Sequence, residues 1–209
     1  MDNAKQVAST LLEIKAVTLS TNPPYTWTSG IKSPIYCDNR LLMSYPDKRQ
    51  QVKEMFLSLI KENNLEFDVI AGVATSGIPH AAWLAEELKK PMIYVRGKAK
   101  EHGKENAIEG VIEKGKKVLV IEDLISTGGS TLFVVEEIRK AGGIVEDCLA
   151  IFTYEFDKAK KAFAEAKANL HTLTNFSTLI EVATENDYLK AADKDTVLEW
   201  SKDPENWGK

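Results

Sequence analysis

Two adjacent carboxylates, Glu122 and Asp123, stand between an apolar run and a small polar turn, an arrangement that can bind a phosphorylated sugar. The apolar run, residues 118–121, is aliphatic and predicts a short buried strand. The turn, residues 126–130, consists of serine, threonine and glycine, and the apolar spacing after it predicts a helix. Such a turn exposes consecutive backbone N–H groups at a helix N-terminus, where a phosphate binds readily. Since carboxylates accept hydrogen bonds from hydroxyls, we expect a ligand with both hydroxyl and phosphate groups.

A second loop of small residues, residues 72–79, also joins a predicted strand to a predicted helix. Its backbone N–H groups could contact another phosphate, although small residues also serve tight turns. The loop has the glycine spacing of a P-loop, but Ile78 occupies the position where that motif requires lysine. No Gly-x-Gly-x-x-Gly follows a strand, which argues against a dinucleotide-binding fold.

A basic segment follows the strand predicted at residues 92–95. Cations beside a leaving pyrophosphate stabilise the charge that develops as its bond to a sugar carbon breaks. Glycines in the segment would let it close over a site and exclude water. The alternative interpretation is a solvated surface loop. Its basic residues are Arg96, Lys98, Lys100, His102 and Lys104.

Strand and helix patterns alternate from about residue 67 onward, which predicts an α/β fold with a mostly parallel sheet covered on both faces. Open sheets of this kind bind ligands at the carboxyl ends of their strands, where the acid pair is expected. The N-terminal section lacks this alternation. Residues 5–18 predict an amphipathic helix, and residues 25–38 predict two short strands that turn at Ser29–Gly30. We expect this section to cap the carboxyl edge of the sheet.

Length and composition limit the class of protein. A chain of 209 residues, 44% of them apolar, can hold one domain over residues 1–209. Its net charge of −4 argues against a nucleic-acid partner, since phosphate contacts dominate such binding. Cys37 and Cys148 form neither a disulfide framework nor a metal pair. No apolar run approaches the ~20 residues that span a membrane, and we expect a cytoplasmic location with no membrane partner.

The strand, acid pair and turn at residues 118–130 resemble the signature of the type I phosphoribosyltransferases. With the hairpin at residues 28–36, the basic segment and the strand at residues 151–154, the chain resembles the orotate phosphoribosyltransferase family. The resemblance implies the type I phosphoribosyltransferase fold, with a small N-terminal hood (about residues 1–45) over a core (about residues 65–155). It also implies transfer of a phosphoribosyl group from 5-phosphoribosyl 1-pyrophosphate (PRPP) to orotate, giving orotidine 5′-monophosphate and pyrophosphate in pyrimidine biosynthesis.

The same resemblance assigns partners and roles. It implies Mg²⁺ bound mainly through the substrate, with no metal site made of protein alone, and a homodimer whose active sites are shared between subunits. Lys100 and Asp123 are the implied catalytic residues, and Ser126 also contacts orotate. The residues implied to bind PRPP are Arg96, Lys100, His102, Glu122, Asp123, Leu124, Ile125, Ser126, Thr127, Gly128, Gly129 and Ser130.

The chain departs from one branch of that family at Thr28, Ser76 and Gly97, where that branch has lysine, and at Tyr36–Cys37, where it has an aromatic pair. Contacts made by those family residues are therefore not transferred. Two alternatives stay open at this stage. A purine phosphoribosyltransferase would share the phosphate-binding residues, because fold does not decide substrate. A regulatory protein that keeps the fold and binds RNA or DNA would need a basic face, which this acidic chain does not suggest.

Overall fold

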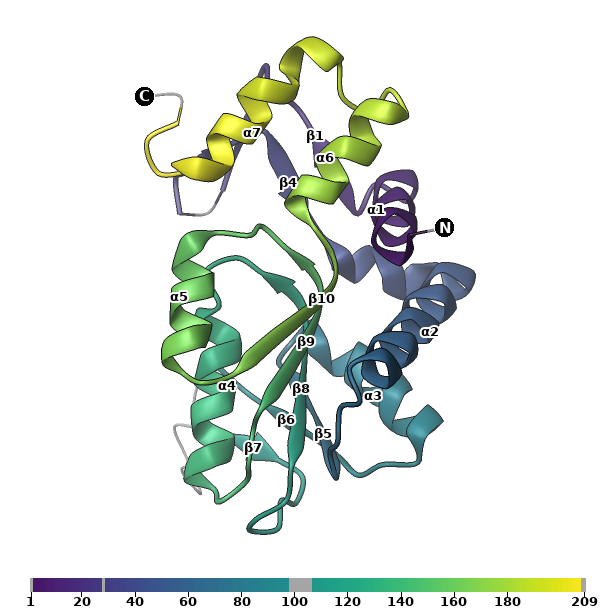
Figure 1. The fold of residues 1–209 in the computed structure, drawn as a ribbon, viewed down its shortest axis with the longest axis vertical. Coiled ribbons are helices and arrows are strands. Elements are labelled where there is room, and N and C mark those ends of the chain that lie inside the picture. The colour runs from purple at the N-terminus through teal and green to yellow at the C-terminus, as the bar shows by residue number, and fades with distance from the viewer. Residues whose placement is uncertain (1, 28, 98–106, 208–209) are drawn as a thin grey trace.

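Strands alternate with helices through most of the chain, and the computed structural model describes residues 2–27, 29–97 and 107–207 (Figure 1). The helices are α1 (Asn3–Glu13), α2 (Pro46–Glu62), α3 (Gly77–Leu88), α4 (Gly129–Lys140), α5 (Asp157–Glu165), α6 (Phe176–Glu185) and α7 (Lys194–Lys202), with 3₁₀ segments η1 (Asn39–Ser44) and η2 (Ala191–Asp193). The strands are β1 (Val17–Leu19), β2 (Tyr25–Thr26), β3 (Lys32–Ser33), β4 (Ile35–Cys37), β5 (Val69–Val73), β6 (Met92–Val95), β7 (Ile108–Glu109), β8 (Val118–Ile125), β9 (Asp147–Thr153) and β10 (Asn169–Asn175).

The central sheet has the strand order β10-β9-β8-β5-β6-β7. All pairs from β10 to β6 are parallel, and β7 is antiparallel to β6. The chain proceeds from β5 outward to β6 and then returns to the other side of β5 as β8. This reversal of direction lies between β5 and β8, and such a switch point opens a crevice at the carboxyl ends of the two strands. Both small-residue loops follow these strands.

Alternate residues of each central strand enter two separate cores, because successive side chains of a strand point to opposite faces. Ile70, Leu119 and Leu149 belong to the core under α1, α2 and α3. Ala71, Val118 and Val120 belong to the core under α4 and α5. Figure 1 shows α4 and α5 on one side of the sheet and α2 and α3 on the other. Burial on both faces explains why these strands are continuously apolar.

Two small antiparallel sheets lie above the carboxyl edge of the central sheet. One pairs β1 with β4, and the other pairs β2 with β3. Helices α6 and α7 lie beside them at the top of Figure 1, so the C-terminal part of the chain joins this region. Buried Trp200 of α7 donates its indole N–H to the carbonyl of Lys32 at 3.0 Å, which ties α7 to the β2–β3 hairpin. We refer to β1–β4 with α6 and α7 as the hood.

Several predicted elements have different bounds in the structure. The N-terminal helix ends at Glu13, and residues 17–19 form β1. The strand predicted at residues 118–121, which is β8 and which we call the signature strand, continues to Ile125, because Leu124 pairs with Phe152 of β9. Strand β7 lies in a stretch that shows no periodicity in the sequence. Within the described part of the chain, no helix combines the length and apolarity needed to cross a membrane.

Candidate active site

The acid pair and the second small-residue loop meet at the switch point between β5 and β8. They line a cavity of about 280 Å³, to which Ser130 also contributes. Ser130 belongs to the turn at residues 126–130, which we call the phosphate turn. Residues of the hood edge complete the wall of this cavity. Its lining residues are Cys37, Asp38, Arg40, Ala74, Thr75, Ser76, Glu122, Asp123, Leu124 and Ser130. The structure therefore brings together segments that are separated by about 50 and 85 residues in the sequence, and we call this space the acid-pair cavity.

Glycine at position 77 lets the second loop lie against the signature strand. A Cβ atom at Gly77 would overlap the backbone oxygen of Ile121, the residue before Glu122. Only glycine permits this approach. The contact fixes the N-terminus of α3 beside the acid pair, and no side chain caps that helix end. The first N–H groups of α3 therefore have no side-chain acceptor, and an anion could bind at this helix end.

Glu122 is buried, with 6% of its surface exposed, and Asp123 is half-buried. Burial, with the nearby charge of Asp123, raises the pKa of Glu122 above its usual range. Burial also raises the pKa of Asp123. Glu122 accepts hydrogen bonds from the backbone N–H of Asp123 (3.0 Å) and from the hydroxyl of Thr131 (3.3 Å). A ligand that donates hydroxyl hydrogens, or a cation, would stabilise the charged forms of this pair.

The phosphate turn joins β8 to α4, and a glycine stands at the start of the helix. Gly128 has φ of +83° and is the N-cap residue of α4, and no side chain caps this end of the helix. The first N–H groups of α4 thus have no side-chain acceptor. A phosphate that accepts from them would also interact favourably with the positive end of the helix dipole.

A second cavity lies between the hood and the signature strand. Its volume is about 440 Å³, and it is lined by Thr26, Trp27, Ser29, Tyr36, Cys37, Leu124, Ser126 and Tyr154. It shares Cys37 and Leu124 with the acid-pair cavity. The rings of Trp27 and Tyr154 lie 5.2 Å apart, and the Trp27 indole donates to the carbonyl of Ile35. A flat apolar ring with polar edges suits this space, which we call the hood cavity.

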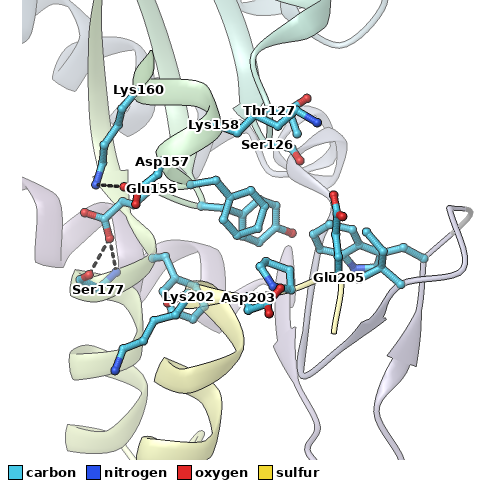
Figure 2. A pocket seen from close by; sticks show the side chains of 17 residues that line it. Ser126, Thr127, Glu155, Asp157, Lys158, Lys160, Ser177, Lys202, Asp203 and Glu205 are labelled. Atoms are coloured by element: carbon cyan, nitrogen blue, oxygen red, sulfur yellow. Dashed lines mark hydrogen bonds and ion pairs between the residues drawn. The ribbon is translucent and has the colours of Figure 1, made fainter. Parts of the chain in front are cut away.

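A third cavity, of about 420 Å³, shares Trp27, Ser126 and Tyr154 with the hood cavity. Figure 2 shows this third cavity from close by. It is bounded by the phosphate turn through Ser126 and Thr127, by the start of α5, and by the C-terminal segment from Ser201 to Glu205. Glu155 accepts from both the backbone N–H and the hydroxyl of Ser177 here, at 2.8 and 2.6 Å. We call this space the α5 cavity.

The basic segment is closed at its base by a backbone hydrogen bond. Arg96 donates its N–H to the carbonyl of Ala107 at 3.0 Å, so the chain leaves and returns at the same point beside β6 and β7. The Arg96 side chain forms an ion pair with Glu109 at 3.2 Å. It lines none of the three cavities defined above. The residue before Arg96, Val95, accepts a backbone hydrogen bond at 3.0 Å from Ala74, which lines the acid-pair cavity.

Comparison with known proteins identifies the family of this chain. Residues 44–170 match the model of the phosphoribosyl transferase domain. The chain is 54% identical to the orotate phosphoribosyltransferase of Coxiella burnetii over 99% of both proteins. The chain belongs to the orotate phosphoribosyltransferase family. The predicted family, type I phosphoribosyltransferase fold and class of enzyme are thereby confirmed.

Solved structures agree with this membership of the orotate phosphoribosyltransferase family. The orotate phosphoribosyltransferase of Aeropyrum pernix superposes with a TM-score of 0.75 at 29% identity, over 84% of this chain and 96% of that one. The UMP synthase of Leishmania donovani superposes with a TM-score of 0.81 at 26% identity. That superposition covers 95% of this chain but only 42% of the longer Leishmania protein.

The structure locates most of the residues predicted to bind PRPP. Glu122, Asp123, Leu124 and Ser130 line the acid-pair cavity, and Ser126 lines both the hood cavity and the α5 cavity. Gly128 and Gly129 form the start of α4, and Thr127 borders the α5 cavity. The side chain of Ile125 is buried in the core, so only its backbone faces the turn. Lys100 and His102 lie outside the described residues.

Sequence reasoning missed several residues of the site. Asp38 and Arg40 line the acid-pair cavity, where the Arg40 guanidinium donates two hydrogen bonds to Asp38 at 2.6 and 2.8 Å. Asn39 between them is buried and donates to the backbone carbonyl of Asp123. A Cys-Asp-Asn-Arg run directly after a predicted strand was the available signal. It gives no hint of its partners, which are about 85 residues away.

Proposed function

We propose that this chain transfers the phosphoribosyl group of PRPP to orotate, with the acid-pair cavity holding the ribose and pyrophosphate and the hood cavity holding the base. The observation that carries this assignment is that the two cavities meet at Cys37 and Leu124. A sugar carbon at that junction would face the base on one side and the pyrophosphate on the other. In the reaction the C1–O bond to pyrophosphate breaks, its electron pair leaves with pyrophosphate, and a ring nitrogen of orotate bonds to C1.

The acid pair serves the ribose in this proposal. Glu122 and Asp123 would accept hydrogen bonds from the ribose hydroxyls, which compensates for the burial that raises their pKa values. The negative charge of Asp123 favours the positive charge that develops on the sugar ring, and this interaction is stronger in the transition state than in the ground state. The ring N–H of orotate is acidic enough that no dedicated base is needed.

The PRPP phosphates occupy the two helix N-termini. The N–H groups at the start of α4, from Gly128 to Ser130, would bind the 5′-phosphate, and residues 74–77 before α3 would bind the pyrophosphate. Ser126, which borders the hood cavity, would also contact orotate. Its hydroxyl can donate to or accept from a ring substituent.

The basic segment would act across a homodimer. Arg96, Lys100 and His102 are assigned to the leaving pyrophosphate of the neighbouring subunit, where their charges stabilise the transition state. The segment η1, next to the acid-pair cavity, and the residue after it expose Leu41, Met43 and Tyr45, an apolar surface that a second subunit could cover.

Mg²⁺ fits this site through oxygen ligands. The hard oxygen donors of Glu122 and Asp123, with substrate oxygens and water, are the ligand type that Mg²⁺ prefers, and the pair would hold the ion mainly through the ribose hydroxyls. When bound, the ion neutralises charge on the pyrophosphate. Among the described residues, no group of three or more His, Cys, Asp or Glu side chains could hold a metal ion. We also propose a cytoplasmic location, which the two free cysteines, Cys37 and Cys148, support.

One assay tests the proposed function. The absorbance of orotate is followed with purified protein, PRPP and Mg²⁺, and the loss of orotate should equal the pyrophosphate released. Adenine, hypoxanthine and xanthine are substituted in parallel and should be left essentially unchanged. Turnover of a purine at the rate of orotate would instead assign a purine phosphoribosyltransferase. No turnover of any base would favour a ligand-sensing role.

A further inference from the structure

A lysine outside the signature points at the phosphate turn. Lys158 lies in the first turn of α5 and lines the α5 cavity together with Ser126 and Thr127. Figure 2 shows its side chain extending from α5 toward these two residues. Among the described residues, the side chain of Lys158 forms no hydrogen bond or ion pair. Its ammonium group is thus available to a ligand at the turn.

Helix α5 is held against the turn at two places. The backbone N–H of Tyr154, just before α5, donates to the carbonyl of Ile125 at 3.0 Å. Farther along the helix, the Phe163 ring packs on Gly128, where an added Cβ would lie 2.8 Å from the ring. Gly128 also has positive φ, so a larger residue is disfavoured both by the Phe163 ring and by the backbone conformation. Lys158 lies between these contacts, and its backbone is therefore fixed relative to the turn.

The phosphate turn has no positive side chain of its own, so a cation such as Lys158 would complete a phosphate site there. Residues 124–130 carry no charged side chain, whereas Glu122 and Asp123 directly before them are acidic. A phosphate dianion there would be bound by backbone N–H groups, hydroxyls and a partial helix charge of about +0.5. A full positive charge at hydrogen-bond distance adds a stronger, charge-assisted interaction.

The other lysines of the α5 cavity are less suited to this role. Lys160 forms an ion pair with Asp157 at 3.5 Å. Lys202 of α7 extends away from the phosphate turn in Figure 2. Lys158 is thus the cation lining this cavity that both points at the turn and has no acidic partner among the described residues.

We propose that Lys158 binds the 5′-phosphate of PRPP, and of the nucleotide product, beside the phosphate turn. The inference rests on the proposed function for the identity of the substrate, although the phosphate contact itself does not depend on the base. Because the 5′-phosphate does not change during the reaction, this contact has the same strength in the ground state and the transition state. Loss of Lys158 should therefore raise KM for PRPP and leave kcat nearly unchanged.

Ribose 5-phosphate is the direct probe, because it has the phosphate and the sugar but neither pyrophosphate nor base. Its dissociation constant is measured by calorimetry for the unchanged chain and for the variants Lys158→Ala, Lys158→Gln, Lys158→Arg and Lys202→Ala. We expect about 10-fold weaker binding for Lys158→Ala and Lys158→Gln. Lys158→Arg should regain part of the affinity, and Lys202→Ala, the matched control from the same cavity, should bind within about 2-fold of the unchanged chain.

Steady-state kinetics separate the possible outcomes. For Lys158→Ala, KM for PRPP should rise about 10-fold while KM for orotate stays within about 2-fold. A rise in KM for orotate alone would show that the ammonium serves the orotate carboxylate and would overturn the proposal. Equal losses for Lys158→Ala and Lys202→Ala, or no binding of ribose 5-phosphate by the unchanged chain, would also overturn it. If the proposed function were wrong, orotate would not be consumed, yet the ribose 5-phosphate titration would still report on Lys158.

Discussion

The side-chain amide of Asn39 donates a hydrogen bond of 2.8 Å to the backbone carbonyl of Asp123. Asn39 is 1% exposed, and its amide oxygen accepts from the Cys37 thiol at 3.3 Å. A single side chain therefore connects the end of β4 in the hood with the acid pair on β8. Because the bond is to the backbone, Asn39 fixes the position of the Asp123 main chain, from which the carboxylate extends. It does not act on the charge of that carboxylate directly.

Removing this amide should destabilise the fold and misplace Asp123. In Asn39→Ala, the carbonyl of Asp123 loses a buried partner, at a cost of about 1–3 kcal/mol in the free energy of unfolding. We expect kcat to fall while KM for orotate changes little, because Asn39 positions the acid pair and touches no base. Asn63→Ala is the control, since Asn63 makes the same kind of bond to the carbonyl of Leu59 at an exposed site. Equal effects of the two variants would argue against a positioning role.

Asp123→Asn tests the charge of the acid pair directly. The variant keeps the shape of the side chain but removes the negative charge proposed to stabilise the developing sugar cation. We expect kcat to fall by about 10²-fold or more, which corresponds to ~2.7 kcal/mol in the barrier. Asp195→Asn, at an exposed position of α7, serves as the control. An unchanged kcat/KM in a folded Asp123→Asn protein would mean that the carboxylate has no part in the reaction.

His80 should make stability depend on pH below neutrality. Desolvation lowers the pKa of this buried imidazole from 6.5 to about 4. Unfolding therefore takes up a proton between these values, so stability is complete above pH ~6.5 and is lost as the pH falls toward 4. Between pH 7 and pH 5 the contribution is about 2 kcal/mol. His80→Phe, which keeps ring contacts to Phe56 and Trp83, should lose less stability than the unchanged chain over this interval.

Denaturant unfolding at pH 7 and pH 5 measures this difference. His80→Gln provides a second, polar replacement in case the larger phenyl ring disturbs the packing. If both variants lose as much stability on acidification as the unchanged chain, His80 is not responsible for the pH dependence.

Trp200 should couple the C-terminal helix to orotate binding. Its ring is fully buried against Trp27 and Tyr154, both of which line the hood cavity, and its N–H bonds to the carbonyl of Lys32. Trp200→Phe keeps a ring but removes this donor, which should cost about 1–2 kcal/mol in unfolding free energy. KM for orotate should rise more than KM for PRPP. Trp83→Phe, a change on α3 far along the chain from the hood, should affect neither KM.

The local patterns of the sequence were sufficient for the core of the fold and for the acid pair. Aliphatic runs predicted β5 and β8, and a run of glycine, serine and threonine predicted the turn before α4. These patterns are readable because they depend only on neighbouring residues in the chain. The strand β8 was predicted too short, since Glu122 and Asp123 interrupt the apolar run, and the strand conformation of residues 122–125 comes from pairing with β9. That pairing is a property of the tertiary structure.

The long-range contacts of the site could not be read from the sequence for the same reason. Asn39 and Asp123 are 84 residues apart, and Lys32 and Trp200 are 168 residues apart. Lys158 belongs to a helix with several lysines, and nothing in its local pattern distinguishes it from Lys160 or Lys161. Only the packing of α5 against the phosphate turn does so.

Lys100 tests both the leaving-group role and the assembly. It lies in the basic segment, outside the described residues, and its assignment rests on the family resemblance. If its contact with pyrophosphate exists mainly in the transition state, Lys100→Ala should lower kcat more than it raises KM. Lys116→Ala, which removes a lysine that pairs with Asp68 at the opposite end of β8, is the control.

Mixing two inactive variants should restore activity if the sites are shared. In a two-fold dimer, the basic segment of one subunit would cover the acid pair of the other. A heterodimer of Lys100→Ala and Asp123→Asn chains then contains one site with a complete segment and a complete acid pair. Its activity should approach half that of the unchanged dimer and lie well above either variant alone. Differently tagged chains allow the heterodimer to be isolated, so that subunit exchange is verified independently. A purified heterodimer as inactive as its parents would show that the basic segment serves its own chain.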